Sequence, residues 1–133
     1  METFARLREK LAAHPTARID ETGQALTVLP STPTGFPVTL RRIGAGYQVS
    51  FEGWHEDFDA EDDAIACFGF GLSNRCRLAI TFRGTSPVQW TVESLRDATW
   101  TPDSTTGLLF TPFWRAKRVE YRSNALLGAP TQA

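Results

Sequence analysis

The sequence has few cysteines, histidines and methionines, and it lacks the long apolar segments of membrane and secreted proteins. It contains two cysteines, two histidines and one methionine among 133 residues. It also has no run of about 18 apolar residues, the length that a helix needs to cross a bilayer. Its first 15 residues are charged and amphipathic, without the apolar region of a secretory signal peptide. We therefore expect a soluble cytoplasmic protein with no membrane partner.

An excess of one charge is also absent from the chain as a whole. The 14 basic and 15 acidic residues leave a formal net charge of −1. There is no general positive field of the kind that neutralises phosphate groups, so we expect no nucleic-acid partner. Arg outnumbers Lys by 12 to 2, a bias that suggests a GC-rich and hence bacterial genome.

Recognised catalytic and metal-binding motifs are missing as well. Segment 57–63 begins like a calcium-binding loop, but Asp62 stands where such a loop needs Gly, and Phe68 where it needs a bidentate Glu. Segment 44–46 lacks the Lys and Ser/Thr of a phosphate loop, and segment 71–75 lacks the second Gly of a nucleophile elbow. We expect no metal site and no cofactor, and the sequence assigns no catalytic residue.

The two cysteines, Cys67 and Cys76, lie nine residues apart, which places them on opposite faces if one helix holds both. A disulfide would require the helix to end between them. In a cytoplasmic protein, two reduced thiols are the better prediction.

The apolar residues that are present indicate one mixed α+β domain over residues 1–133. Phe4, Leu7 and Leu11 have helical spacing, and apolar and polar residues alternate from Ala25 onward as in strands. A second helix is predicted over residues 60–73. The predicted order is helix, three strands, helix and three to five strands. Tight turns favour a mainly antiparallel sheet of about six to eight short strands, and a loose tail is predicted from about residue 124.

Seven of the 15 carboxylates lie within residues 52–63, around His55. Part of this excess has a structural explanation, because Asp59 is predicted to cap the second helix with Asp62 at its third position. Acidic side chains also favour the positive end of a helix. Three acids exceed what a helix start needs, and they are candidates for a binding surface: Glu52, Glu56 and Asp57.

Aromatic residues are plentiful, with four Trp, nine Phe and two Tyr. A sheet covered by helices on one side leaves its other side free, and the outward positions of the predicted strands are polar. Trp54 or Trp100 is predicted at the rim of this polar face. Together the face and its rim describe a shallow cup for a small molecule or an extended peptide.

The basic segment 114–122 is a counterpart to the acidic segment 52–63. The two either pair within one molecule or contact another chain, and the aromatic segment 111–114 beside them suits such a contact. We therefore predict a non-catalytic binding or interaction module that uses the acidic segment and the aromatic rim. Its partner is another protein or a second copy of the chain.

The alternative prediction is a small-molecule-binding cup or an enzyme that uses the polar sheet face. This alternative requires four side chains to converge there: Arg41, Arg83, Glu93 and His55. Acid/base chemistry by His55 would depend on a neighbouring carboxylate, and Asp57 shares its face if both lie on one strand. The full set of candidate binding residues is Trp54, His55, Glu56, Asp57, Arg41, Arg83, Glu93 and Trp100.

Overall fold

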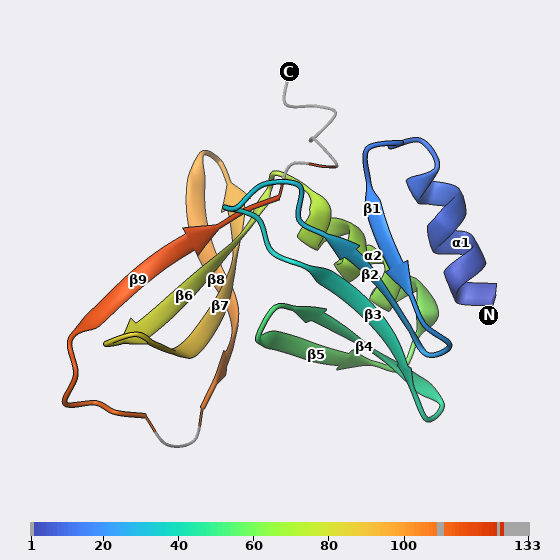
Figure 1. Ribbon diagram of the computed structural model, residues 1–133. Coiled ribbons are helices and arrows are strands. Elements are labelled where there is room, and N and C mark those ends of the chain that lie inside the picture. The colour runs from blue at the N-terminus through green and yellow to red at the C-terminus, as the bar shows by residue number, and fades with distance from the viewer. Residues whose placement is uncertain (1, 109–110, 125, 127–133) are drawn as a thin grey trace.

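A computed structural model describes residues 2–108, 111–124 and 126 (Figure 1). Within these residues, two helices and two antiparallel sheets confirm the predicted α+β class and antiparallel pairing. The elements are α1 Glu2–Leu11, β1 Arg18–Glu21, β2 Ala25–Leu29, β3 Val38–Ile43, β4 Gly46–Phe51, β5 Trp54–Phe58, α2 Glu61–Leu72, β6 Cys76–Arg83, β7 Ser86–Arg96, β8 Thr99–Gly107 and β9 Lys117–Arg122.

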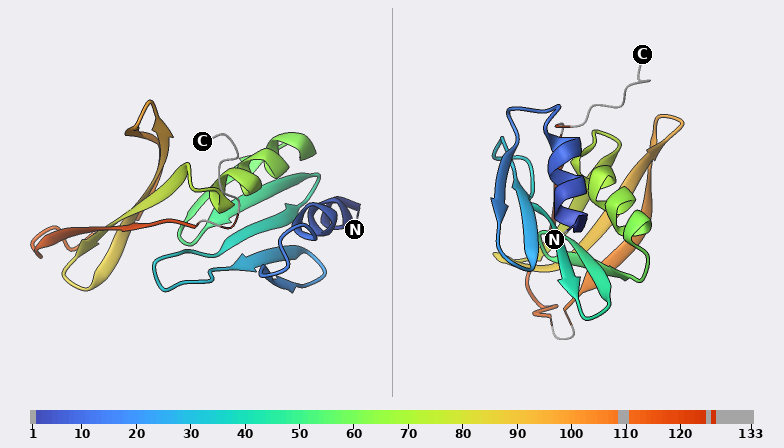
Figure 2. Two further views of the ribbon diagram at one scale, coloured as in Figure 1. Left: turned by 90° about the horizontal axis from the view of Figure 1, so that it is seen from above. Right: turned by 90° about the vertical axis from the view of Figure 1, so that its right-hand side faces the viewer.

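The first sheet has the strand order β1-β2-β3-β4-β5, so every strand pairs with its neighbour in the chain. Alternation along the strands sends apolar side chains to one face and polar side chains to the other. Leu40 of β3 and Val49 of β4 lie opposite each other, and both are fully buried. Helices α1 and α2 lie over this apolar side (Figure 2). The core of the protein therefore sits between the helices and the first sheet, and it continues into the second sheet at Leu78, Ile80 and Val92.

Two strands of the first sheet, β1 and β5, were not predicted. Every residue of β1 is exposed, so burial does not alternate along the segment. It is a strand because its backbone pairs with β2. In β5, Glu56 is one of the residues that face the helices. A charged residue on this face interrupts the alternation of apolar and polar residues by which a strand is predicted. Pairing with β4 therefore extends the sheet into the acidic segment, where a connection to the second helix was expected.

The second helix is close to its predicted position, but its predicted cap is wrong. Ala60 is the N-cap residue, with an extended backbone and no side-chain hydrogen bond to the helix. Because β5 continues to Phe58, Asp59 lies in the short bend between strand and helix. The carboxylate of Glu61 instead accepts hydrogen bonds from Thr3 and Arg6 of α1. The first turn of α2 is thus bound by another helix.

The second sheet has the order β8-β7-β6-β9 and projects away from the first sheet (Figures 1 and 2). Its inner face packs against β5 and the turn before it. Gly53 of that turn lies against the ring of Trp90, where an added Cβ would be 2.2 Å from Cε2. Trp54 stacks on Phe51 with ring centroids 4.6 Å apart, and its indole N–H donates to Ser104 Oγ at 3.1 Å. Trp54 therefore joins the two sheets.

The predicted loose tail begins at a residue that is anchored. Asn124 Oδ1 accepts a hydrogen bond from the backbone N–H of Phe36 at 3.1 Å, and Asn124 Nδ2 donates to the carbonyl oxygens of Phe36 and Gly71, both at 3.0 Å. Leu126 packs against the core. The rest of the predicted tail lies outside the described residues. Within them, neither helix is long and apolar enough to cross a membrane.

Candidate functional site

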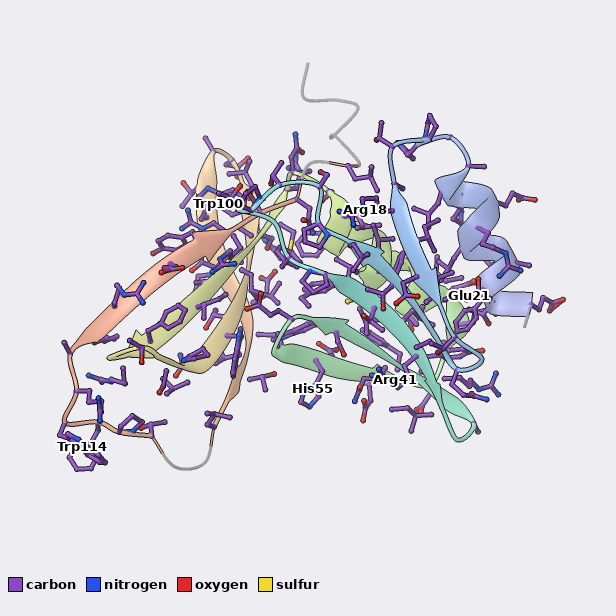
Figure 3. The ribbon with its side chains drawn as sticks, in the orientation of Figure 1. Arg18, Glu21, Arg41, His55, Trp100 and Trp114 are labelled. Carbon is purple, nitrogen blue, oxygen red and sulfur yellow. The ribbon has the colours of Figure 1, made fainter. Side chains whose placement is uncertain are left out.

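Three of the candidate residues lie on the open face of the first sheet. Cross-strand pairing places Arg41 next to Gln48 and Asp57 in one row, and Thr39 next to Ser50 and His55 in the adjacent row. Gln48 Nε2 donates to Asp57 Oδ1 at 3.2 Å. Figure 3 shows Arg41 and His55 projecting from the same side of the sheet. The prediction that His55 and Asp57 share a face depended on a strand here, and β5 supplies it.

Arg83, Glu93 and Trp100 lie on the other sheet. Glu93 Oε1 accepts a hydrogen bond from Arg77 Nε at 2.6 Å, and the Arg77 guanidinium carbon lies 4.6 Å from the ring centroid of Trp100 and 4.1 Å from that of Tyr121. Arg83 Nη1 donates to the carbonyl oxygen of Arg115 at 3.4 Å. The four residues of the enzyme or cup alternative are thus divided between two sheets, and Arg77 is the partner of Glu93.

The acidic segment does not form one surface. Trp54 is buried, and β5 directs Glu56 to the helix side of the sheet and Asp57 to the open side. Glu61 and Asp62 pair with Arg6 of α1. Hydrogen bonding from Thr3, followed by the smaller effect of Arg6, lowers the pKa of Glu61. Two of the seven carboxylates of the acidic segment therefore serve the contact between the two helices.

The basic segment has its own internal partner. The carboxylate of Glu120 binds Arg122 at 3.1 Å and also contacts Arg118, and these two hydrogen bonds lower its pKa. Within the described residues, no ion pair joins segment 114–122 to segment 52–63. The charged side chains of the two segments that have no ion-pair partner in the described part of the chain are exposed to solvent.

Exposed apolar side chains gather on the described part of the β8–β9 connection and on β9. Five of the seven exposed large hydrophobic residues in the described part of the chain fall within residues 108–121. Phe113 and Trp114 are the most exposed, at 74% and 71%, with their rings edge to face at 5.4 Å. Figure 3 shows Trp114 at the far end of the second sheet, clear of the rest of the protein. We call the following residues the β9 surface: Phe113, Trp114, Arg115, Lys117, Val119 and Tyr121.

Short backbone contacts position the loop that carries these two rings. The N–H of Phe113 donates to Thr111 O at 2.8 Å, and the N–H of Arg115 donates to Pro112 O at 2.9 Å. Gly84, in the β6–β7 turn, donates to Ala116 O at 2.8 Å and has φ of +63°, a conformation that favours glycine. The loop is therefore tied to the neighbouring hairpin while its two aromatic side chains remain in water.

Phe113 and Trp114 are absent from the set of candidate residues that the sequence indicated. Their signal is the aromatic pair directly before a run of basic residues. Segment 111–114 was expected to suit a contact, but the sequence alone does not distinguish an exposed ring from a core ring. The tertiary structure makes this distinction, because it buries Trp54 and leaves Trp114 exposed.

The surroundings of Cys67 and Cys76 favour the neutral thiol at both positions. Both cysteines are free, and α2 ends between them. Burial, with a smaller contribution from Glu56, raises the pKa of Cys67 to about 12. Burial is also the main cause that raises the pKa of Cys76 to about 12. The thiolate, which is the nucleophile and the metal ligand, is therefore strongly disfavoured at both positions.

A metal centre has no support in the geometry of the described residues, where no group of three or more His, Cys, Asp or Glu side chains is placed to hold an ion.

The exposed β9 surface is the candidate site that exposure and charge define best. No protein-family model, curated protein or solved structure matches the chain.

Proposed function

We propose that the protein is a non-catalytic interaction module that binds an extended acidic segment of another protein on the β9 surface. The observation that carries this proposal is the exposure of Phe113 and Trp114 side by side at the end of the second sheet. Exposed apolar patches of this kind mark interaction sites, and Trp is enriched among the residues that dominate binding energy. Burial of each ring stabilises a complex by about 1.5–3 kcal/mol.

The charge of the β9 surface supports an acidic partner. Residues 104–119 contain no Asp or Glu, whereas Arg115 and Lys117 are exposed. Arg83 adds a third cation beside the loop through its hydrogen bond to Arg115 O. Arg118 is not part of this surface, because its guanidinium lies over Phe82 and contacts Glu120. Opposite charge on a partner would steer its approach and fix its orientation.

The geometry of β9 supports an extended partner. Among the described residues, β9 pairs only with β6, so its other edge has no strand beside it there and can accept an added strand. Exposed Val119 and Tyr121 lie on one face of β9, directly after the loop in the chain, and the Arg77 guanidinium lies over the Tyr121 ring. A segment that lies on a membrane surface is commonly an amphipathic helix with one apolar face, whereas Lys117–Arg122 is a strand. The strip along β9 instead fits the side chains of a bound strand.

A second copy of the chain fits less well as the partner. The acidic segment is spread over both faces of β5 and the first turn of α2. Part of its charge is already engaged by Arg6 and Gln48. A continuous acidic strip complementary to β9 is therefore missing from the acidic segment itself.

The test uses a fluorescent peptide of alternating Glu and Val residues, measured by fluorescence anisotropy. We expect this peptide to bind, with affinity falling as salt is added. The double variant Phe113→Ala and Trp114→Ala should weaken binding by more than about 30-fold, because it removes two central anchors. Both residues are exposed, so the variant should keep its fold, which circular dichroism checks.

The matched control is Ile43→Ala, which removes an exposed apolar residue at the other end of the protein. It should leave binding unchanged, and a peptide of alternating Lys and Val should not bind. Failure of the Glu peptide to bind, or equal binding by the double variant, would contradict the proposal. So would preferential binding to phosphatidylserine vesicles, or self-association that the double variant abolishes in sedimentation experiments.

A further inference from the structure

A second feature, distant in sequence from the β9 surface, is a cleft where α2, the β4–β5 hairpin and the second sheet meet. Its volume is about 330 Å³, within the range of sites that hold small organic molecules. It is lined by residues from five elements: Phe51, Trp54, Glu56, Ala66, Cys67, Phe70, Val92, Asp103 and Ser104.

Most of the cleft wall is apolar and aromatic. Phe51 and Trp54 are buried and stacked on each other, so their position is fixed by the core. Phe70 and Ala66 of α2 also line the cleft, and because Phe70 is only partly buried and Ala66 is exposed, these two side chains present its accessible apolar surface. Cys67 contributes a neutral thiol, since its high pKa keeps it protonated. These surfaces fit the hydrocarbon body of a ligand.

The charged groups of the cleft are all acidic. Glu56 and Asp103 line it, and no basic residue does. Asp103 Oδ2 accepts a hydrogen bond from Ser94 Oγ at 2.5 Å, and Arg96 Nη2 lies 3.4 Å from Asp103 Oδ1. In the described structure, the carboxylate of Glu56 has neither a hydrogen bond nor an ion pair. A partner of opposite charge for Glu56 is therefore missing from the protein itself.

We propose that this cleft binds a small amine, with its apolar body against Phe70 and Ala66 and its ammonium group at Glu56. The mostly apolar lining fits an organic cation and not a hydrated metal ion. A metal ion also requires a cluster of ligands, which the described residues do not form. The carboxylate of Glu56, which has no basic partner among the described residues, disfavours carboxylates and phosphates beside it, whereas the charge of Asp103 is paired with Arg96. Ser104 contributes an oxygen that already accepts the indole N–H of Trp54.

The test compares three ligands of similar shape: phenethylamine, phenethyl alcohol and phenylacetate. Titration calorimetry measures affinity, and the indole N–H signal of Trp54 in nitrogen-15 NMR spectra reports the location. We expect phenethylamine to bind roughly tenfold more tightly than the alcohol, because a hydrogen bond to a charged group exceeds a neutral one by about this factor. Phenylacetate should not bind.

The matched variants are Glu56→Gln and Asp57→Asn, which remove neighbouring charges on opposite faces of β5. Glu56→Gln should abolish the preference for the amine, and Asp57→Asn should keep it. Ala66→Phe, at an exposed position in α2, should fill the cleft and prevent binding of both the amine and the alcohol. Each variant is checked for its fold by circular dichroism.

Three results would overturn the inference. Equal affinity for amine and alcohol would show an apolar cleft without charge selection. Equal effects of Glu56→Gln and Asp57→Asn would show a general attraction to the acidic segment. Absence of any shift of the Trp54 signal at high ligand concentration would show that the cleft does not bind amines. None of these results depends on the β9 surface, so this inference and the proposed function fail independently.

Discussion

Close packing at single residues decides how α2 lies on the first sheet. Gly71 is buried in the last turn of the helix and faces the ring of Phe51. An added Cβ at this position would be 2.3 Å from Cε1 and 2.5 Å from Cζ of that ring. The ring itself is fixed by contacts with Phe36 and Trp54. A glycine is therefore required here by the approach of the helix to the sheet.

We expect Gly71→Ala to lower the free energy of unfolding by about 1–3 kcal/mol, because the methyl group forces apart a packed core. The sign of this change in the free energy of unfolding is informative, because alanine normally stabilises a helix interior by about 1 kcal/mol relative to glycine. Urea unfolding followed by circular dichroism measures the change.

Gly23→Ala is the control, since an added Cβ at Gly23 meets no atom within 4 Å. Its effect should stay within about 0.5 kcal/mol. A neutral or stabilising Gly71→Ala would mean that Phe51 moves aside without cost, contrary to the packing described here.

At the scale of elements, the start of α2 is stabilised by α1 in place of a capping side chain. Thr3 and Arg6 bind Glu61, and Arg6 Nη1 also lies 3.1 Å from Asp62 Oδ1. These contacts favour the ionised carboxylate of Glu61, which is why its pKa is lowered in the folded state. They join two helices that are separated by the whole first sheet in the sequence.

This contact predicts a loss of stability in acid. Because the folded-state pKa of Glu61 is lowered from its ordinary value of 4.5, its stabilising effect is fully present above that value. It is lost as the pH falls through the lower folded-state pKa. We expect the free energy of unfolding to decrease between about pH 5 and pH 3, and Glu61→Gln to reduce this dependence. Urea unfolding across that range provides the measurement.

Glu61→Gln should flatten the pH dependence without abolishing it, since the pKa of Glu120 is also lowered, by Arg122 and Arg118. Asp63→Asn removes a charge from the same helical turn and serves as the control. An unchanged acid dependence in Glu61→Gln, or an equal reduction in Asp63→Asn, would argue against a specific role for the Thr3 and Arg6 contacts.

At the scale of the whole molecule, the contact between the two sheets makes one folding unit of them. Trp54 belongs to the first sheet, and its indole N–H donates to Ser104 of the second. The same two residues line the cleft. The integrity of this contact therefore affects both stability and the shape of the proposed amine site.

We expect Ser104→Ala to lower the free energy of unfolding by about 1–3 kcal/mol, because it leaves the buried indole N–H of Trp54 without an acceptor. Tryptophan fluorescence and far-ultraviolet circular dichroism should report one coincident transition, as expected if the two sheets unfold together. Chemical denaturation with both probes measures these quantities.

Thr105→Ala, one residue along β8, is the control. Thr105 is exposed and shares a hydrogen bond with Thr91 on the outer face of the sheet. Its loss should change stability by about 0.5 kcal/mol or less. Separate transitions for the two probes would mean that the sheets unfold independently, and equal effects of the two variants would remove the special role of Ser104.

The candidate site was only partly predictable from the sequence. Alternation correctly predicted an open polar face, and in the first sheet this face carries Thr39, Arg41, Gln48 and Ser50. The sequence did not place Arg83 and Glu93 on a different sheet from Arg41, because strand alternation says which face a residue takes and not which sheet. It also did not pair Glu93 with Arg77, a contact that depends on the register of β6 and β7.

By itself, the sequence determined the α+β class, the two helices and most strands, because helical and strand periods and turn residues act over a few neighbouring positions. The tertiary structure decided the division into two sheets and the inclusion of β1 and β5. It also buried Trp54, exposed Trp114 and formed the cleft. These features depend on pairing and packing between residues far apart in the chain. One local sequence pattern is compatible with several tertiary arrangements, and the arrangement that buries a common core is the one selected.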